Sequence, residues 1–188
     1  MTGEKKRTTS GLDIFIRPET KYEREQVNQL IYSAFSASYD EDTATEIVEH
    51  FKQERTKDTF VPELSFVALL ENGLIVGQVT LHKTDIITDS GRNTQLTLSQ
   101  SAVLPEQRMR GIMRVLVTYA LNKAKKSGYA AVFLGGNPTV YGRYDFVPSY
   151  KYNIFHELRA QKGDEGFLAC ELFAGALVGV AGTTSYYG

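Results

Sequence analysis

The sequence has little cysteine, little net charge and no long apolar run. Its 188 residues include one cysteine, Cys170, which excludes an internal disulfide and favours a reducing, cytoplasmic location. The 21 basic and 22 acidic residues give a net charge of −1, so the charge balance does not support nucleic-acid binding. No apolar run approaches the roughly 18 residues that a membrane-spanning helix needs. We therefore expect a soluble protein with no nucleic-acid and no membrane partner.

The sequence is also poor in metal-binding patterns and in repeats. His50 and His156 have no second ligand at a spacing typical of metal sites, so we predict no metal. Residues 1–10 are polar and lack apolar periodicity, and we expect them to form a mobile N-terminal tail. The remaining length and the 42% hydrophobic content fit one domain over residues 11–188.

Apolar periodicity predicts a mixed α/β order. Alternating residues predict a first strand over 12–18, and helical spacing then predicts two early helices. The turn pair Asn72-Gly73 between two β-branched segments predicts a hairpin. The later elements are expected as a strand over 95–104, a helix over 112–128, a short buried strand over 129–136, a helical turn over 139–146 and a closing pair of strands at 150–155 and 166–173.

The segment AVLPEQRMRGIMRVLV is the most informative about chemistry. The fourth strand breaks at Pro105, and a short loop bearing Arg108, Arg110 and Gly111 leads into a helix that carries Arg114. The free N–H groups and the positive dipole end of such a helix attract anions, and a glycine lets a pyrophosphate approach the backbone. A basic helix start is also common as an ordinary solvated end. The local pattern leaves both interpretations open.

This segment resembles the signature of the GNAT superfamily of N-acetyltransferases. That signature is Gln or Arg, two residues, Gly, one residue, then Gly or Ala, after a strand ending in Val-X-Pro. The match is Arg108, Gly111 and Met113, with Met113 where the family prefers a smaller residue. The resemblance implies that acetyl-CoA is the cosubstrate. The residues expected to bind it are Ala102, Val103, Leu104, Arg108, Met109, Arg110, Gly111, Ile112, Met113, Arg114 and Asn137.

A second block, LGGNPTVYGRYDFVP, resembles the family's fifth strand and the helix after it. Asp145-Phe146 stands for the common Gly-Phe. Together with LFAGALVGVAGTTSYY near the carboxy terminus, the order of these blocks is similar to the YhbS-like branch of the superfamily, over about residues 12–188. The resemblance implies a strongly twisted, largely antiparallel sheet flanked by helices. Strands four and five would splay apart, with acetyl-CoA between them.

Acetyl transfer to an amine needs a polarised thioester carbonyl, an acid for the departing thiolate and a base for the amine. The resemblance assigns the carbonyl to a backbone N–H within residues 102–104 and the acid to Tyr141. Many family members carry a glutamate base on the fourth strand, where this chain has Ser99 followed by Gln100. Asp85, His82 or a water chain could serve instead. Cys170 is expected to be a small buried hydrophobe, which argues against a ping-pong mechanism.

The sequence therefore predicts an N-acetyltransferase that moves an acetyl group from acetyl-CoA directly to an unidentified amine. The acceptor would be a small molecule or a peptide, and a homodimer is left open. Two alternatives remain: a non-catalytic CoA-binding sensor or interaction module, and an acyltransferase that uses a longer acyl-CoA.

Overall fold

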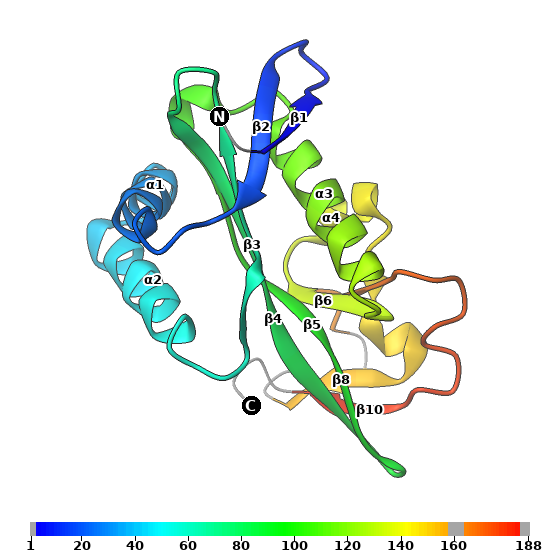
Figure 1. The fold of residues 1–188 in the computed structure, drawn as a ribbon. Coiled ribbons are helices and arrows are strands. Elements are labelled where there is room, and N and C mark those ends of the chain that lie inside the picture. The colour runs from blue at the N-terminus through cyan, green and yellow to red at the C-terminus, as the bar shows by residue number, and fades with distance from the viewer. Residues whose placement is uncertain (1–2, 158–163, 185–188) are drawn as a thin grey trace. The chain divides into compact units, whose positions relative to one another are not determined.

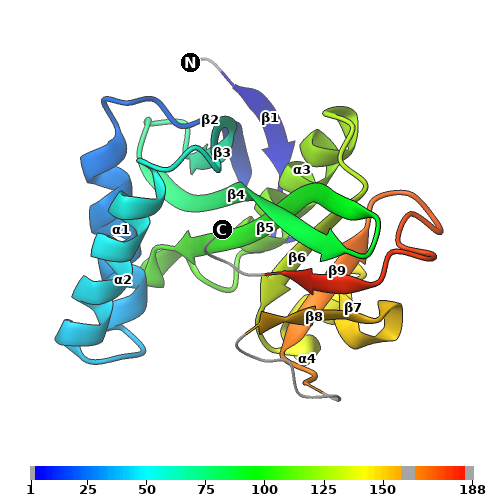
Figure 2. The same cartoon turned by 90° about the horizontal axis from the view of Figure 1, so that it is seen from below.

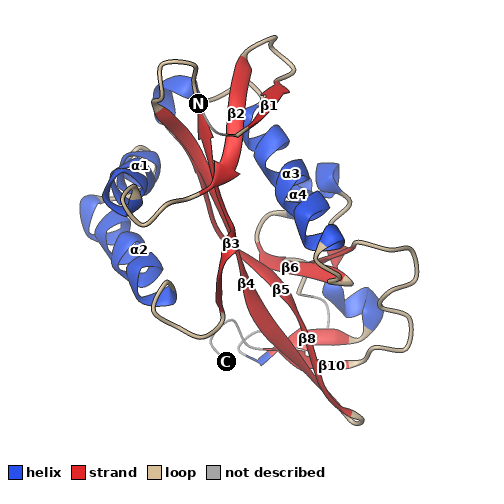
Figure 3. Cartoon of the chain, viewed as in Figure 1, coloured by secondary structure: helices blue, strands red, loops and turns tan. Residues whose placement is uncertain are grey.

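The computed structural model describes residues 3–157 and 164–184 and has a mixed α/β fold with a mostly antiparallel open sheet (Figures 1 and 3). Four helices and ten strands are seen in these ranges, with three short 3-10 turns among them. The helices are α1 (Arg24–Ser36), α2 (Glu41–Glu54), α3 (Ile112–Lys126) and α4 (Pro138–Tyr141). The strands are β1 (Glu4–Arg7), β2 (Asp13–Pro18), β3 (Phe60–Leu69), β4 (Ile75–Thr88), β5 (Gly91–Val103), β6 (Ala131–Gly135), β7 (Val147–Pro148), β8 (Ile154–His156), β9 (Phe167–Glu171) and β10 (Gly182–Thr184).

The chain divides into two compact units. The first contains residues up to 81 together with 99–120, and the second contains residues 82–98 and those from 121 onward. Strands β4 and β5 and helix α3 each contribute residues to both units. That residues 11–188 form one domain remains a prediction.

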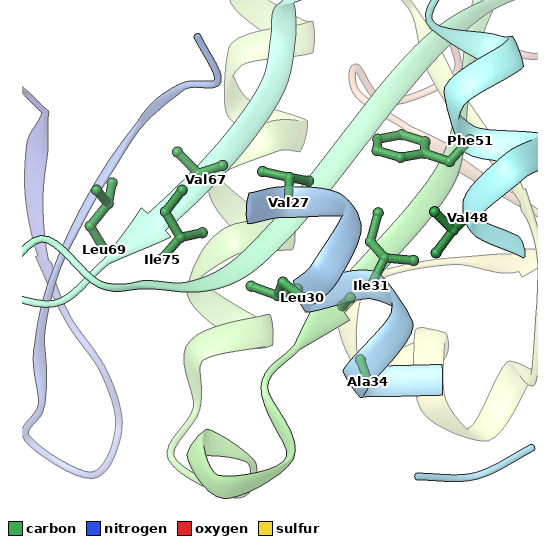
Figure 4. Packing of buried hydrophobic residues seen from close by; sticks show 10 residues of the cluster. Val27, Leu30, Ile31, Ala34, Val48, Phe51, Val67, Leu69 and Ile75 are labelled. Atoms are coloured by element: carbon green, nitrogen blue, oxygen red, sulfur yellow. The ribbon is translucent and has the colours of Figure 1, made fainter. Parts of the chain in front are cut away.

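In the first unit, α1 and α2 lie side by side and pack on one face of the strands (Figure 2). Both helices begin with helix-forming sequences and bury their apolar stripes, and Asp40 caps α2 by accepting a hydrogen bond from the Thr43 N–H at 2.9 Å. Figure 4 shows the resulting core. Its buried members are Val27, Leu30, Ile31, Ala34, Val48, Phe51, Val67, Leu69, Ile75 and Ala102.

The first turns of α3 pack on the opposite face of the same strands. Because side chains alternate along β3, Phe66 points away from the core residues Val67 and Leu69, and its ring meets Tyr119 of α3 edge-on at 5.1 Å. Close approach requires Gly77 on β4, since a Cβ there would lie 2.8 Å from Leu116 Cδ1. The N-terminal half of α3 therefore packs closely on β3 and β4.

In the second unit, β6 lies between β5 and β9. It pairs in parallel with β5 at Leu96–Val132 and Thr97–Phe133, and antiparallel with β9. β8 runs parallel to β10, and the two lie side by side in Figure 2. The sequence predicts that the strands at 150–155 and 166–173 form a closing pair. The structure instead pairs β9 with β6 and β7, and β8 with β10.

The predicted hairpin, the strand before Pro105 and the helix after it are confirmed. The expected tail differs from the structure, because residues 4–7 form β1, which pairs antiparallel with β2 from Glu4–Ile16 to Arg7–Asp13. A strand at a sheet edge is held by backbone hydrogen bonds and needs no apolar periodicity, so the sequence pattern gave no sign of it. Among the described residues, no helix combines the length and apolar character needed to cross a membrane.

Candidate functional site

The end of β5 offers one backbone N–H for a substrate carbonyl. Of the expected residues 102–104, Leu104 already donates its N–H to the Val76 carbonyl of β4 at 3.0 Å. Neighbouring residues of a strand direct their N–H groups to opposite sides, so the N–H of Val103 points away from β4. The geometry therefore narrows the candidate donor to Val103.

The loop after β5 turns sharply into α3, as the sequence predicted. Met109 has φ 60° and Gly111 has φ 80°, both in the left-handed region, and the Met109 side chain is fully exposed. The Val115 N–H donates to the Gly111 carbonyl at 3.2 Å, so Gly111 is the residue directly before α3 and accepts its first helical hydrogen bond. The first turn of α3 has no acidic side chain, whereas its last turn has three lysines. The N–H groups of the first helical turn and the dipole at this end favour an anion.

The arginines of this loop do not share one role. The Arg108 guanidinium donates through Nη2 to the Ala34 carbonyl near the end of α1, so it is used in packing the loop against the helix. Arg110 and Arg114 are exposed. Arg108 is exposed as well, so Arg110 and Arg114 are the arginines of this segment that can offer charge to a phosphate without giving up that packing contact.

The N-terminal segment packs directly against the loop. A Cβ added to Gly111 would lie 2.5 Å from Thr9 Oγ1, and the Ser10 hydroxyl donates to the Arg110 carbonyl at 3.0 Å. Gly111 is thus required for two structural reasons, its positive φ and the contact with Thr9. A substitution at Gly111 would strain the fold itself, and the exposed arginines are cleaner probes of anion binding.

Tyr141 and Asn137 belong to the second unit. Asn137 caps α4, because its side-chain oxygen accepts a hydrogen bond from the Thr139 N–H at 2.8 Å. The half-buried Tyr141 ring lies near Tyr144 and Phe146, with ring centroids 6.3 and 6.0 Å away. Tyr141 is therefore held by neighbouring rings in a defined orientation.

Gly136 makes room for the Tyr141 ring, which leads to a prediction. A Cβ at Gly136 would lie 2.7 Å from Tyr141 Cε2, so Gly136→Ala should displace the ring. We expect the turnover number of Gly136→Ala to fall about tenfold or more, as for a misplaced catalytic group, with acetyl-CoA affinity retained. Steady-state kinetics and calorimetry measure the two effects. Wild-type turnover by Gly136→Ala would show that the orientation of Tyr141 is unimportant.

The base candidates considered from the sequence lie in different surroundings. Asp85 accepts a hydrogen bond from Thr94 at 2.6 Å and pairs with Arg92 at 2.9 Å, which fits a structural role near the β4–β5 turn. His82 is buried, in contrast to the surface position that is common for a strand histidine. Ser99 and Gln100 are half-buried on β5. Asp85 is engaged in an ion pair, His82 is buried, and Ser99 and Gln100 have neither a carboxylate nor an imidazole. None of these four residues is therefore a good candidate for the general base.

Cys170 is buried on β9, as expected for a small hydrophobe. Burial, followed by the nearby Asp145 and Glu171 carboxylates, raises the pKa of its thiol to about 11. The thiol therefore stays protonated at neutral pH, which makes it a poor nucleophile.

Sequence reasoning missed a carboxylate on α2. Glu54 is buried, its Oε1 lies 3.4 Å from Nε2 of His50 one turn earlier on α2, and the nearby Ser99 hydroxyl of β5 favours its ionised form. Burial raises the pKa of Glu54. The apolar spacing of the helix revealed its buried face, but not that the last turn carries an acid into the interior.

Comparison with known proteins gives a consistent result. A family model described as an acetyltransferase (GNAT) domain matches residues 15–148. The N-acetyltransferase YhbS of Escherichia coli (strain K12) is 29% identical over 153 residues, which cover 80% of this chain and 84% of that protein. The structure of E. coli YhbS in complex with CoA superposes with a TM-score of 0.76 at 22% identity, covering 100% of this chain and 94% of that one. An acetyltransferase of Brucella melitensis in complex with acetyl-CoA gives 0.67 at 19% identity, covering 93% and 96%.

Proposed function

Since the chain belongs to the GNAT acetyltransferase family and is an acetyl-CoA-dependent N-acyltransferase, we propose that it transfers the acetyl group directly to an amine of a small molecule or peptide. The observation that carries this proposal is the strand end and helix start at residues 103–114, where a backbone N–H and an electropositive helix end follow each other in the chain. CoA and acetyl-CoA in the complexes of the two similar structures also support it.

The residues of this chain suggest how the reaction would proceed. The first turn of α3, with Arg110 and Arg114, would bind the pyrophosphate of acetyl-CoA. The Val103 N–H would polarise the thioester carbonyl and stabilise the oxyanion that forms when the amine attacks. Tyr141 would give its phenolic proton to the departing thiolate. The protonated Cys170 thiol fits direct transfer, in which no acyl-cysteine forms.

Binding of acetyl-CoA tests the proposal first. A ligand that binds only the folded state at 100 times its dissociation constant stabilises it by about 2.7 kcal/mol, so we expect the thermal midpoint to rise by several degrees. Arg110→Glu combined with Arg114→Glu should weaken acetyl-CoA binding about tenfold or more, because two exposed cations beside the helix start are reversed. Calorimetry measures the affinity.

The control for that variant is Lys21→Glu, which reverses an exposed cation in the loop before α1. The proposal would be overturned if wild-type protein showed neither a thermal shift nor calorimetric heat at millimolar acetyl-CoA. A CoA-release screen across amine classes and acyl donors then separates an acetyltransferase from a non-catalytic CoA-binding module and from an enzyme of longer acyl groups.

A further inference from the structure

Glu54 occupies a costly position for a carboxylate. Only 9% of its side chain is exposed, and it is the last residue of α2, where the helix dipole is negative. Burial and the dipole both disfavour the charged form, and a neutral or apolar residue would avoid this cost. Perturbed carboxylates cluster at functional sites, which makes Glu54 a candidate for a functional residue.

Three polar groups face the Glu54 carboxylate. His50, one turn earlier on α2, places its Nε2 3.4 Å from Glu54 Oε1. The Ser99 hydroxyl of β5 lies nearby, and its oxygen is buried without a hydrogen-bond partner among the described residues, while Lys57 contributes a positive charge. Each of these three groups favours the ionised carboxylate, although burial outweighs them.

The end of α2 is fixed in place next to Glu54. The Arg55 guanidinium donates to Asn28 Oδ1 at 2.7 Å and pairs with Glu19, and it lies over the Phe51 ring with its Cζ 4.1 Å from the centroid. These contacts anchor the last turn to α1 and to the residue after β2. Glu54 is consequently held on a rigid support, which a residue that positions a proton acceptor requires.

The two members of the His50–Glu54 pair differ in access to solvent. The His50 side chain is 35% exposed, whereas Glu54 lies behind it. An imidazole at the surface with a carboxylate behind it can take up a proton and be stabilised as imidazolium. The partner Ser99 precedes Val103 by four residues on β5, about 13 Å along the strand. The pair therefore borders the strand that offers the proposed carbonyl donor.

We propose that His50 and Glu54 together act as the general base, an inference that rests on the proposed function. The ammonium group R–NH3+ gives one proton to the imidazole and keeps the electron pair as R–NH2. Glu54 is the positioning residue and balances the positive charge of the imidazolium. The amine then attacks the thioester carbonyl, the C–S bond breaks, and the thiolate takes the proton of Tyr141. The new amide nitrogen loses its second proton, which restores the Tyr141 phenol, and the half-exposed imidazole returns its own proton to solvent.

The test compares two acceptors in a CoA-release assay. The first acceptor is an amine that is protonated at neutral pH. It is the most active such amine in a panel of polyamines, amino acids, aminoglycosides and lysine peptides. The second is hydroxylamine, which is already neutral at pH 7 and needs no base. Glu54→Gln and His50→Gln should each lower kcat/KM for the protonated amine about a hundredfold, and should lower it far less for hydroxylamine. The double variant should have about the same kcat/KM for the protonated amine as the less active single variant, because the pair acts as a unit.

The matched control is Glu49→Gln on the same helix, whose carboxylate forms an exposed pair with Lys52 at 2.7 Å. It should leave both rates unchanged. Folding is checked by thermal unfolding at several pH values. Because the pKa of Glu54 is raised in the folded state, the ionised side chain costs stability above that pKa. Glu54→Gln should therefore be at least as stable as wild type at pH 8, with the difference fading as the pH falls.

A pH profile separates catalysis from structure. Wild-type kcat/KM for the protonated amine should fall at low pH, where the base is protonated, and this acid limb should be lost in the variants. Wild-type rates and an unchanged profile in both Glu54→Gln and His50→Gln would overturn the inference alone. Failure of the wild-type protein to release CoA with every amine, hydroxylamine included, would overturn the proposed function and this inference with it.

Discussion

Replacing Tyr141 by phenylalanine is expected to lower kcat by about ten- to a thousandfold while acetyl-CoA affinity stays nearly the same. The substitution removes only the phenolic hydroxyl, which is the proposed proton donor to the CoA thiolate. The ring itself packs next to Gly136, Tyr144 and Phe146, and these contacts involve ring atoms that phenylalanine retains. We therefore expect the fold to be preserved. Steady-state kinetics with the amine from the CoA-release screen measures the loss.

The control for this variant is Tyr129→Phe, which removes a half-buried phenol from the loop between α3 and β6. Its turnover should match that of the wild type. A tyrosine that serves only packing would alter stability or nothing when its hydroxyl is removed. Wild-type turnover by a folded Tyr141→Phe enzyme would thus remove the acid assignment, while the proposal of acetyl-CoA binding would stand.

Elements with strong local signals could be predicted from the sequence. The helical spacing of Val27, Leu30 and Ile31 gave the buried face of α1, and Asn72-Gly73 gave the β3–β4 hairpin. The start of α3 followed from Gly111 and the apolar residues after it. In each case the pattern that defines the element lies within a few neighbouring residues.

Features that depend on contacts between distant residues could not be predicted. β1 exists because its backbone pairs with β2, and β8 pairs with β10 about 28 residues further along the chain. The contact of Thr9 with Gly111 and that of Glu54 with Ser99 likewise join residues far apart in sequence. The family resemblance pointed to the fourth predicted strand, which is β5 in the structure, as the place of the basic carboxylate. In the structure the carboxylate near Ser99 of β5 is that of Glu54 on α2.

One departure from the family pattern has a local explanation. Asp145-Phe146 stands where the family commonly has Gly-Phe, so Asp145 replaces a glycine. Asp145 adopts φ 67° at the end of a 3-10 turn. Glycine enters this left-handed region freely, and aspartate is among the few other residues that visit it routinely. The backbone conformation is therefore kept although the residue differs, and Phe146 remains buried beside Tyr141.

Replacing Phe51 by alanine is expected to lower the free energy of unfolding by about 3–5 kcal/mol. The Phe51 side chain is fully buried in the core of the first unit (Figure 4), and alanine would leave a cavity that its neighbours fill only in part. The ring also lies under Arg55, so the cation–π contact would be lost. Urea unfolding should show a lower midpoint with an unchanged slope.

The control for Phe51→Ala is Tyr22→Ala, which truncates an aromatic side chain that is 84% exposed just before α1 and should change stability by no more than about 0.5 kcal/mol. The same variant tests the support of Glu54, because Phe51 and Arg55 together hold the last turn of α2. If that support positions the base, the folded fraction of Phe51→Ala should lose turnover with a protonated amine more than with hydroxylamine. A loss of less than about 1 kcal/mol would mean that the side chains around Phe51 can close the cavity, and would contradict the rigid packing on which the position of Glu54 depends.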